Sequence, residues 1–200
     1  DLEVTHALSL TDPQLIELNP LSCAVFLAKE GMKLDLGCLA KGYIADKIAD
    51  YLKSQHVMSA LINLGGNIKT IGNNALADRP WQIGIQDPRQ PRGTNLAVLP
   101  ICNQSVVTSG IYERKLQVNE RTYHHILDRK TGYPVDTQLA SITIISDNSL
   151  DGEIWTTRLY GEKPRQLLAR VEQEKGIEVL IVTTDNRVYY SSGISPEFLA

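Results

Sequence analysis

Glu153 and Thr157 stand four residues apart in a segment, 150–160, whose pattern predicts a helix. Side chains at this spacing share one helix face, with their Cβ atoms about 5–6 Å apart. A carboxylate and a hydroxyl there offer two hard oxygen donors, which suit Mg²⁺ because that ion keeps its other positions for water and phosphate. The pair alone predicts little, because a solvated helix face contains the same residue types.

The stretch Tyr123-His-His-Ile-Leu-Asp128 places two histidines and a carboxylate just before a polar turn at 129–132. Adjacent side chains of a strand point to opposite faces, so only one of His124 and His125 can face a given site. Loops at strand ends commonly carry binding sites, and this turn offers amides and cations to an anion. The alternative is that both histidines are structural.

Two further segments, Asn-Leu-Gly-Gly-Asn at 63–67 and Val-Thr-Ser-Gly at 107–110, read as small-residue turns that end strands. Glycine allows close approach of a ligand to the backbone, and free amides can cradle phosphate. Lys41 begins a predicted helix, where a cation opposes the helix dipole unless an anion lies nearby. These features favour a phosphate-bearing ligand, with tight turns and a solvated lysine as the alternative.

Hydrophobic periodicity predicts the elements that must position these residues. Helices are predicted at 40–54, 150–160 and 164–174. Strands are predicted at 22–28, 32–36, 58–64, 67–71, 81–86, 95–101, 114–118, 121–127, 140–146, 178–183 and 187–191. Strands and helices mix without regular βαβ alternation, which is typical of an α+β fold with largely antiparallel sheets and packed helices.

Composition narrows the class of protein. The 200 residues carry a formal net charge of −3 with no Lys/Arg cluster, which argues against a nucleic-acid partner. No apolar run is long enough to predict a transmembrane segment. Three widely spaced cysteines fit neither a disulfide framework nor a zinc knuckle. The compartment stays open: a membrane-anchored lipoprotein outside the cytoplasm if an upstream signal exists, otherwise a cytoplasmic protein.

Taken together, these segments resemble the ApbE family, the FAD:protein FMN transferases. The resemblance covers roughly residues 30–192 and implies one ApbE-like domain over 1–200, the C-terminal major part of the family's fold, without an N-terminal portion. The matching stretches, in the family's order, are Asp35-Leu-Gly-Cys-Leu-Ala-Lys-Gly-Tyr43, Ala60-Leu-Ile-Asn-Leu-Gly-Gly-Asn-Ile68, Ser105-Val-Val-Thr-Ser-Gly110, Tyr123-His-His-Ile-Leu-Asp-Arg-Lys-Thr-Gly-Tyr-Pro134 and Ala140-Ser-Ile-Thr-Ile144.

The resemblance implies that FAD is cut at its pyrophosphate, that FMN joins a threonine of an acceptor flavoprotein through a phosphoester, and that AMP leaves. It implies Mg²⁺ bound by the main-chain oxygen of Cys38 and the side chains of Glu153 and Thr157. His125 is then the catalytic residue, as a general base or as an electrostatic stabiliser. The implied FAD-binding residues are Asp35, Lys41, Gly65, Gly66, Thr108, Ser109, His125, Ile126 and Asp128.

One residue departs from the family pattern, which usually has Asp where this chain has Glu153. The extra methylene moves the carboxylate by about one bond length, and Mg²⁺ demands near-ideal geometry. Two other functions are therefore weighed beside transfer. One is an FAD-binding module without transfer activity, and the other is a Mg²⁺-dependent FAD pyrophosphatase that releases FMN and AMP.

Overall fold

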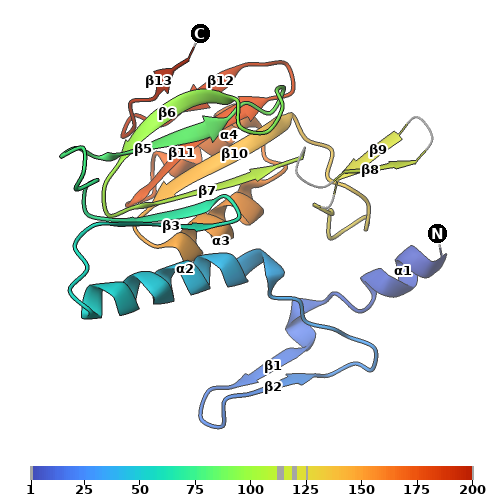
Figure 1. Ribbon diagram of the computed structural model, residues 1–200. Helices are drawn as coiled ribbons and strands as arrows, with labels where there is room; N and C mark the ends of the chain where they lie inside the picture. The colour runs from blue at the N-terminus through green and yellow to red at the C-terminus, as the bar shows by residue number, and fades with distance from the viewer. Residues whose placement is uncertain (1, 112–114, 119–120, 125, 200) are drawn as a thin grey trace. The chain divides into compact units, whose positions relative to one another are not determined.

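The computed structural model describes residues 2–111, 115–118, 121–124 and 126–199, with the side chains of 112–125 left out of the description. The chain forms two compact units, coloured along the sequence in Figure 1. Unit 1 contains Asp1–Leu36 and Lys115–Val135, and unit 2 contains Gly37–Arg114 and Asp136–Ala200. That the two units act as a single domain stays a prediction.

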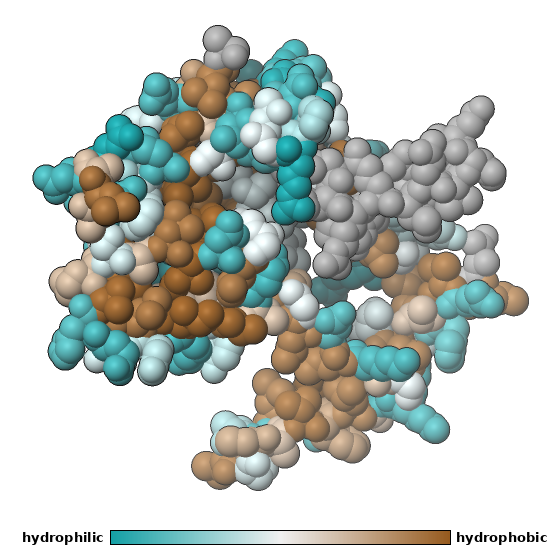
Figure 2. All heavy atoms as spheres, viewed as in Figure 1, coloured by the Kyte–Doolittle hydropathy of each residue, from teal (hydrophilic) through white to brown (hydrophobic). Residues whose placement is uncertain are grey.

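Unit 1 consists of short elements: helix α1 (Leu2–Leu8), a 3₁₀ turn (Pro13–Leu15), and the antiparallel hairpins β1–β2 and β8–β9. The strands are β1 (Ile16–Asn19), β2 (Ala24–Leu27), β8 (Lys115–Val118) and β9 (Arg121–His124). Apolar side chains gather on the surface of the β1–β2 hairpin, as Figure 2 shows. Among the described residues, every buried apolar side chain belongs to unit 2.

The first hairpin corrects one prediction. A strand at 22–28 is confirmed as β2, but its partner is β1, and residues 32–36 form no strand. The turn chemistry lies at Asn19, whose Oδ1 accepts the amides of Leu21 and Ser22 at 3.1 Å each. Cys23 then takes the left-handed conformation (φ 51°) that closes the turn. An asparagine that bonds the backbone two residues on is a turn former, and the chain reverses there between β1 and β2.

Unit 2 is built on a six-stranded sheet in which every pairing is antiparallel, with the order β12-β11-β10-β7-β4-β3. Its central strands are nearly continuous runs of buried residues, as expected when both faces of a sheet are covered. The strands are β3 (Ala60–Leu64), β4 (Asn67–Ile71), β7 (Ser105–Gly110), β10 (Leu139–Ser146), β11 (Ile177–Thr183) and β12 (Val188–Tyr190).

One face of this sheet packs against a second sheet of order β13-β6-β5, formed by β5 (Trp81–Gln86), β6 (Asn95–Ile101) and β13 (Glu197–Phe198). The core between the two sheets is aliphatic. From β5 and β6 it takes Ile83, Ile85, Leu99 and Ile101, and from the large sheet Val106, Ile145, Leu180 and Val182. The predicted α+β class with largely antiparallel sheets is confirmed.

The other face of the large sheet carries helices α2 (Gly37–Ser54) and α3 (Ser149–Leu159), and α4 (Pro164–Val171) packs beside β11 and β12 (Figure 1). Ala45 and Ala49 of α2 are buried against Ile62 and Ile71. Helix α2 begins three residues before the predicted start at 40. The prediction missed this first turn because Gly37 and Cys38 are exposed and add nothing to the apolar periodicity. None of the described helices combines the length and the hydropathy needed to cross a membrane.

Helices α2 and α3 meet at Gly42. A Cβ atom built there would lie 2.6 Å from the carbonyl oxygen of Ser149 and 2.8 Å from the Cα of Leu150. Both are backbone atoms at the start of α3, so they cannot swing aside as a side chain could. Only glycine lets the two helices approach this closely, and this approach sets the spacing between residues near the start of α2 and those along α3.

Replacing Gly42 with Ala tests this packing. Alanine is the better helix former by about 1 kcal/mol, so an uncrowded site would gain stability. We expect the variant to lose about 1–3 kcal/mol of unfolding free energy instead, because the methyl group overpacks a backbone contact. Urea unfolding followed by circular dichroism measures the change, with Asp50→Ala on the exposed side of α2 as the control. A Gly42→Ala protein as stable as the wild type would contradict the close approach.

Candidate functional site

Glu153 is a buried carboxylate, 5% exposed, on the side of α3 that meets α2 and β4. Its Oε1 accepts a hydrogen bond from Asn67 Nδ2 at 2.8 Å and lies 3.4 Å from Lys41 Nζ. The structure thus brings together two residues predicted from the sequence, Lys41 and Glu153. Asn67 was not among the predicted site residues, although it is the last residue of the Asn-Leu-Gly-Gly-Asn segment.

A hydrogen-bonded chain extends from this cluster into the start of α3. Ser149 Oγ donates to Asn67 Oδ1 at 2.6 Å, and both atoms are buried. The amides of Ser149 and Leu150 donate to the two carboxylate oxygens of Asp46, at 2.8 and 2.9 Å. Asp46 belongs to α2, so one helix caps the other, while the residue at the formal N-cap position, Asn148, makes no side-chain cap bond.

A carboxylate in this position is well suited to cap α3. The first amides of a helix have no partner within the helix, and its N-terminus carries a partial positive charge, so an acceptor with negative charge satisfies both. Sequence periodicity does not find such a cap, because Asp46 is 103 residues away from Ser149 in the chain. The cap holds the N-terminus of α3 on α2. It therefore fixes where Glu153 lies along the length of α2.

Lys69 of β4 is a buried cation, 4% exposed, next to the cap. Its Nζ donates to the main-chain oxygen of Asp147 and lies 3.9 Å from Asp46 Oδ1. Burial lowers the pKa of Lys69, and the nearby Asp46 carboxylate partly opposes that shift. Lys69 and Asp46 therefore compensate each other's charge beneath the site, which leaves the Glu153 carboxylate to Asn67 and Lys41.

The other two predicted metal ligands lie on the same helices as Lys41 and Glu153. Thr157 is exposed, one helical turn after Glu153, and Cys38 is exposed in the first turn of α2. A helical carbonyl accepts one amide and keeps a second lone pair, so the Cys38 oxygen can serve as a ligand. Carboxylate, hydroxyl and carbonyl are all hard oxygen donors, and this set fits Mg²⁺.

A site of this kind contains a single carboxylate. Within the part of the chain that the structure describes, no three His, Cys, Asp or Glu residues lie in a metal-binding group. Mg²⁺ uses one or two carboxylates together with substrate phosphates, so it is the ion that these donors favour.

Gly65 and Gly66 form the two-residue turn between β3 and β4. Both have positive φ, 63° and 95°, as a type I′ hairpin turn requires. Asn63 Oδ1 accepts the amide of Gly66 at 2.9 Å, and both glycines are exposed. The structure therefore gives a tight turn with accessible backbone, and binding of a flavin by these glycines stays a prediction.

Thr108 and Ser109 lie inside β7, so the interpretation of 107–110 as a strand-ending turn is wrong. The strand continues to Gly110 because β10 pairs with it along its whole length. Thr108 Oγ1 is 2.8 Å from Thr143 Oγ1 of the neighbouring strand, a cross-strand hydroxyl pair of a kind that stabilises sheets. A role for Thr108 and Ser109 in binding FAD stays a prediction.

The remaining predicted residues belong to unit 1, where Asp35 is exposed and Ile126 and Asp128 are half-buried. Asp128 closes a loop: its Oδ1 accepts the amide of Lys130 at 2.6 Å, and its amide donates to the carbonyl of Tyr133 at 2.8 Å. Its carboxylate thus already has a structural use. His125, the predicted catalytic residue, lies outside the described residues.

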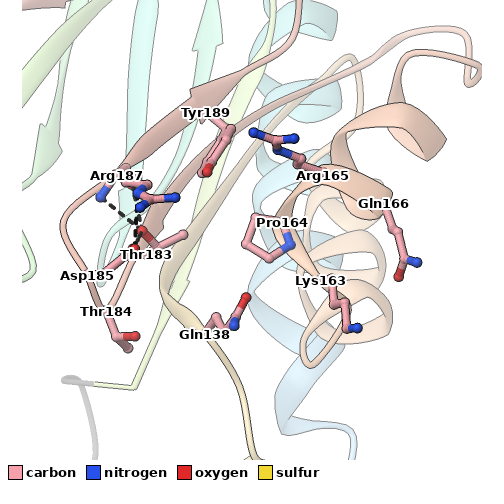
Figure 3. A pocket seen from close by; sticks show the side chains of 10 residues that line it. All are labelled: Gln138, Lys163, Pro164, Arg165, Gln166, Thr183, Thr184, Asp185, Arg187 and Tyr189. Atoms are coloured by element: carbon pink, nitrogen blue, oxygen red, sulfur yellow. Dashed lines mark hydrogen bonds and ion pairs between the residues drawn. The ribbon is translucent and has the colours of Figure 1, made fainter.

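A separate cavity of about 500 Å³ lies in unit 2 between α4, the start of β10 and the β11–β12 hairpin (Figure 3). Its lining includes Lys163, Arg165 and Arg187, and Arg187 pairs with Asp185 at 3.1 Å. None of the residues predicted to bind metal or flavin lines this cavity. The chemistry-bearing cluster of unit 2 is the one around Glu153.

Comparison with known proteins identifies the class. The chain belongs to the ApbE family, whose model matches residues 1–181. It is 45% identical over 190 residues to an FAD:protein FMN transferase of Klebsiella pneumoniae, covering 95% of this chain and 58% of that protein. It is 38% identical over 177 residues to an FAD:protein FMN transferase of Treponema pallidum, covering 85% of this chain and 49% of that protein.

Solved structures agree with this placement. The ApbE protein of Thermotoga maritima superposes with a TM-score of 0.86 at 30% identity, covering 96% of this chain and 62% of that one. The flavin transferase ApbE of Vibrio cholerae superposes with a TM-score of 0.80 at 27% identity, covering 96% and 60%. The chain therefore spans about half to three fifths of the length of the relatives it matches.

Removing the cap on α3 should weaken the fold of unit 2. We expect Asp46→Ala to lose at least about 2 kcal/mol of unfolding free energy, because an N-cap contributes about 0.5–2 kcal/mol and the buried Lys69 loses its counter-charge. Asp46→Asn is the intermediate variant, since its one carbonyl oxygen keeps an acceptor for one of the two α3 amides, while the charge and the second acceptor are lost. Thermal and urea unfolding measure both. Ordinary surface substitutions change the unfolding free energy by no more than about 0.5 kcal/mol. If Asp46→Ala changes it by no more than that, the cap does not stabilise α3.

Proposed function

We propose that the protein is a Mg²⁺-dependent FAD:protein FMN transferase. It takes FMN from FAD, joins it to a threonine of an acceptor flavoprotein, and releases AMP. The observation that carries the proposal is the buried Glu153 carboxylate beside Lys41 and one helical turn before Thr157, in a chain that belongs to the ApbE family. The relatives named as FAD:protein FMN transferases support the same reaction.

Glu153, Thr157 and the main-chain oxygen of Cys38 would hold the cation. Bound there, Mg²⁺ would neutralise negative charge on the pyrophosphate and on the transition state of phosphoryl transfer. Lys41 is half-exposed beside Glu153, so its ammonium can turn from that carboxylate to a phosphate oxygen. A cation close to the carboxylate also keeps the buried charge of Glu153 compensated before substrate arrives.

The proposed transfer forms one bond and breaks one. The acceptor threonine oxygen bonds to the phosphorus of the FMN half, and the bond from that phosphorus to the bridging oxygen breaks, so that the bridging oxygen leaves on AMP. His125 takes the threonine proton or stabilises the developing charge. Further contacts to FAD are assigned, on the family resemblance, to Asp35, Gly65, Gly66, Thr108, Ser109, Ile126 and Asp128.

The reaction is tested by mixing the protein with FAD, Mg²⁺ and an acceptor that carries the target threonine. We expect covalent flavin fluorescence on the acceptor in a denaturing gel, with AMP released in equal amount. EDTA should stop the transfer and added Mg²⁺ should restore it. An acceptor with Ala at the target position is the control. AMP without flavin on the acceptor would indicate a pyrophosphatase, and FAD binding without AMP would indicate a binding module; either result contradicts transfer.

The two adjacent histidines give a matched pair of variants for the catalytic role. His125→Ala should lower the transfer rate by about 10²–10⁴-fold, the usual contribution of a general acid or base, with only a modest loss of FAD affinity. His124→Ala is the control, because it removes the same side chain type at the adjacent position. Rates come from in-gel fluorescence and affinities from quenching of flavin fluorescence. Unchanged turnover in His125→Ala would remove that residue from the mechanism.

A further inference from the structure

Asn67 is the first residue of β4 and one of the most deeply buried polar side chains of unit 2, at 1% exposed. Both ends of its carboxamide are engaged: Nδ2 donates to Glu153 Oε1 at 2.8 Å, and Oδ1 accepts from Ser149 Oγ at 2.6 Å. The Glu153 carboxylate and the Asn67 oxygen both only accept hydrogen bonds, so the Asn67 NH₂ group must face Glu153. The Asn67 oxygen then faces Ser149, and the carboxamide has a single orientation that satisfies both neighbours. Its position is therefore fixed by chemistry as well as by packing.

The fixed amide distinguishes the two oxygens of Glu153. Oε1 faces Asn67 and lies 3.4 Å from Lys41 Nζ. Among the described residues, no group is hydrogen-bonded to Oε2. A glutamate has three side-chain torsions and is otherwise free to turn its carboxylate, so a bond to one oxygen sets the direction of the other. The amide of Asn67 thus selects which oxygen of Glu153 is presented to a ligand.

The contact also depends on the length of the side chain at 153. Aspartate there would withdraw the carboxylate by about 1.5 Å, one carbon–carbon bond, and break a 2.8 Å hydrogen bond. The Asn67 amide would then be a buried donor without its acceptor, which costs the full desolvation of that group. Glu153 and Asn67 are therefore matched in length in this chain.

We propose that Asn67 is a positioning residue that orients the Glu153 carboxylate for a divalent cation. The inference rests on the proposed function, because it takes Glu153 to be a metal ligand. Groups that hold a ligating carboxylate from behind commonly contribute 10–100-fold to metal affinity. Both ends of the Asn67 carboxamide are occupied by Glu153 and Ser149, so its effect should appear in metal affinity through Glu153 alone.

The test measures binding of Mn²⁺ alone to the full chain, by electron paramagnetic resonance of the free ion. Mn²⁺ prefers the same oxygen donors as Mg²⁺. We expect Asn67→Ala to weaken Mn²⁺ binding about 10–100-fold, and Ser149→Ala, which frees the far end of the carboxamide, to weaken it by a smaller factor. Ser105→Ala is the control: it removes a buried hydrogen bond to Ile68, 2.8 Å long, that has no contact with Glu153. It should lower the melting temperature without changing Mn²⁺ affinity.

A double-mutant cycle separates positioning from mere destabilisation. Ser149→Ala should weaken Mn²⁺ binding in the wild-type background and have little further effect when Asn67 is already Ala, because Ser149 reaches Glu153 only through the Asn67 carboxamide. Additive effects, or an Asn67→Ala protein that binds Mn²⁺ as the wild type does, overturn the inference. If Asn67→Ala fails to fold, Ser149→Ala carries the test by itself: it should still weaken Mn²⁺ binding, and an unchanged affinity overturns the inference.

Failure of the proposed function looks different. Glu153→Gln removes the ligand itself, so it should abolish Mn²⁺ binding. If Glu153→Gln binds Mn²⁺ normally, or if the wild type binds none, the metal site around Glu153 is wrong and the positioning role falls with it. If Glu153→Gln loses binding while Asn67→Ala keeps it, the metal site stands and only the role of Asn67 is rejected.

Discussion

The junction between α2 and α3 is the constraint on which the site in unit 2 depends. Two features make the junction: the close approach at Gly42, where no Cβ can be accommodated, and the Asp46 carboxylate that caps the first amides of α3. The Gly42 contact sets the distance between the two helices, and the Asp46 cap sets how far α3 is shifted along α2. Lys41 and Glu153 meet at 3.4 Å because both features hold at once.

The junction also explains why buried charges are tolerated there. Lys69 and Asp46 lie 3.9 Å apart beneath the junction, and Lys41 and Glu153 lie above it, so each buried charge has a neighbour of opposite sign. A buried charge without such a partner is strongly unfavourable. Asn67 and Ser149 connect the two pairs with hydrogen bonds of 2.8 and 2.6 Å. The hydrogen bonds and the two ion pairs therefore form one network around Glu153, the carboxylate that would hold the cation.

The sequence predicted the local features well and the long-range ones poorly. The helix containing Glu153 and five of the six strands of the large sheet, all except β7, follow from periodicity, which is a local property. The Asp46 cap, the Asn67 amide and the Gly42 contact join residues more than eighty positions apart, and periodicity carries no information about them. The same limit explains the turn at 107–110: its small residues looked like a strand end, but pairing with β10 extends the strand to Gly110. In unit 1 the partner of β2 could not be predicted from a strand at 32–36, because the turn that pairs β2 lies before it, at Asn19.

The central claim is that Glu153 holds a divalent cation at the α2–α3 junction. The most direct measurement is anomalous diffraction from a crystal of the protein grown with Mn²⁺ and FAD. We expect one strong anomalous peak about 2.1 Å from a Glu153 carboxylate oxygen, with Thr157 and the Cys38 carbonyl among the other ligands. A peak bound by other residues, with Glu153 still hydrogen-bonded only to Asn67 and Lys41, would contradict it.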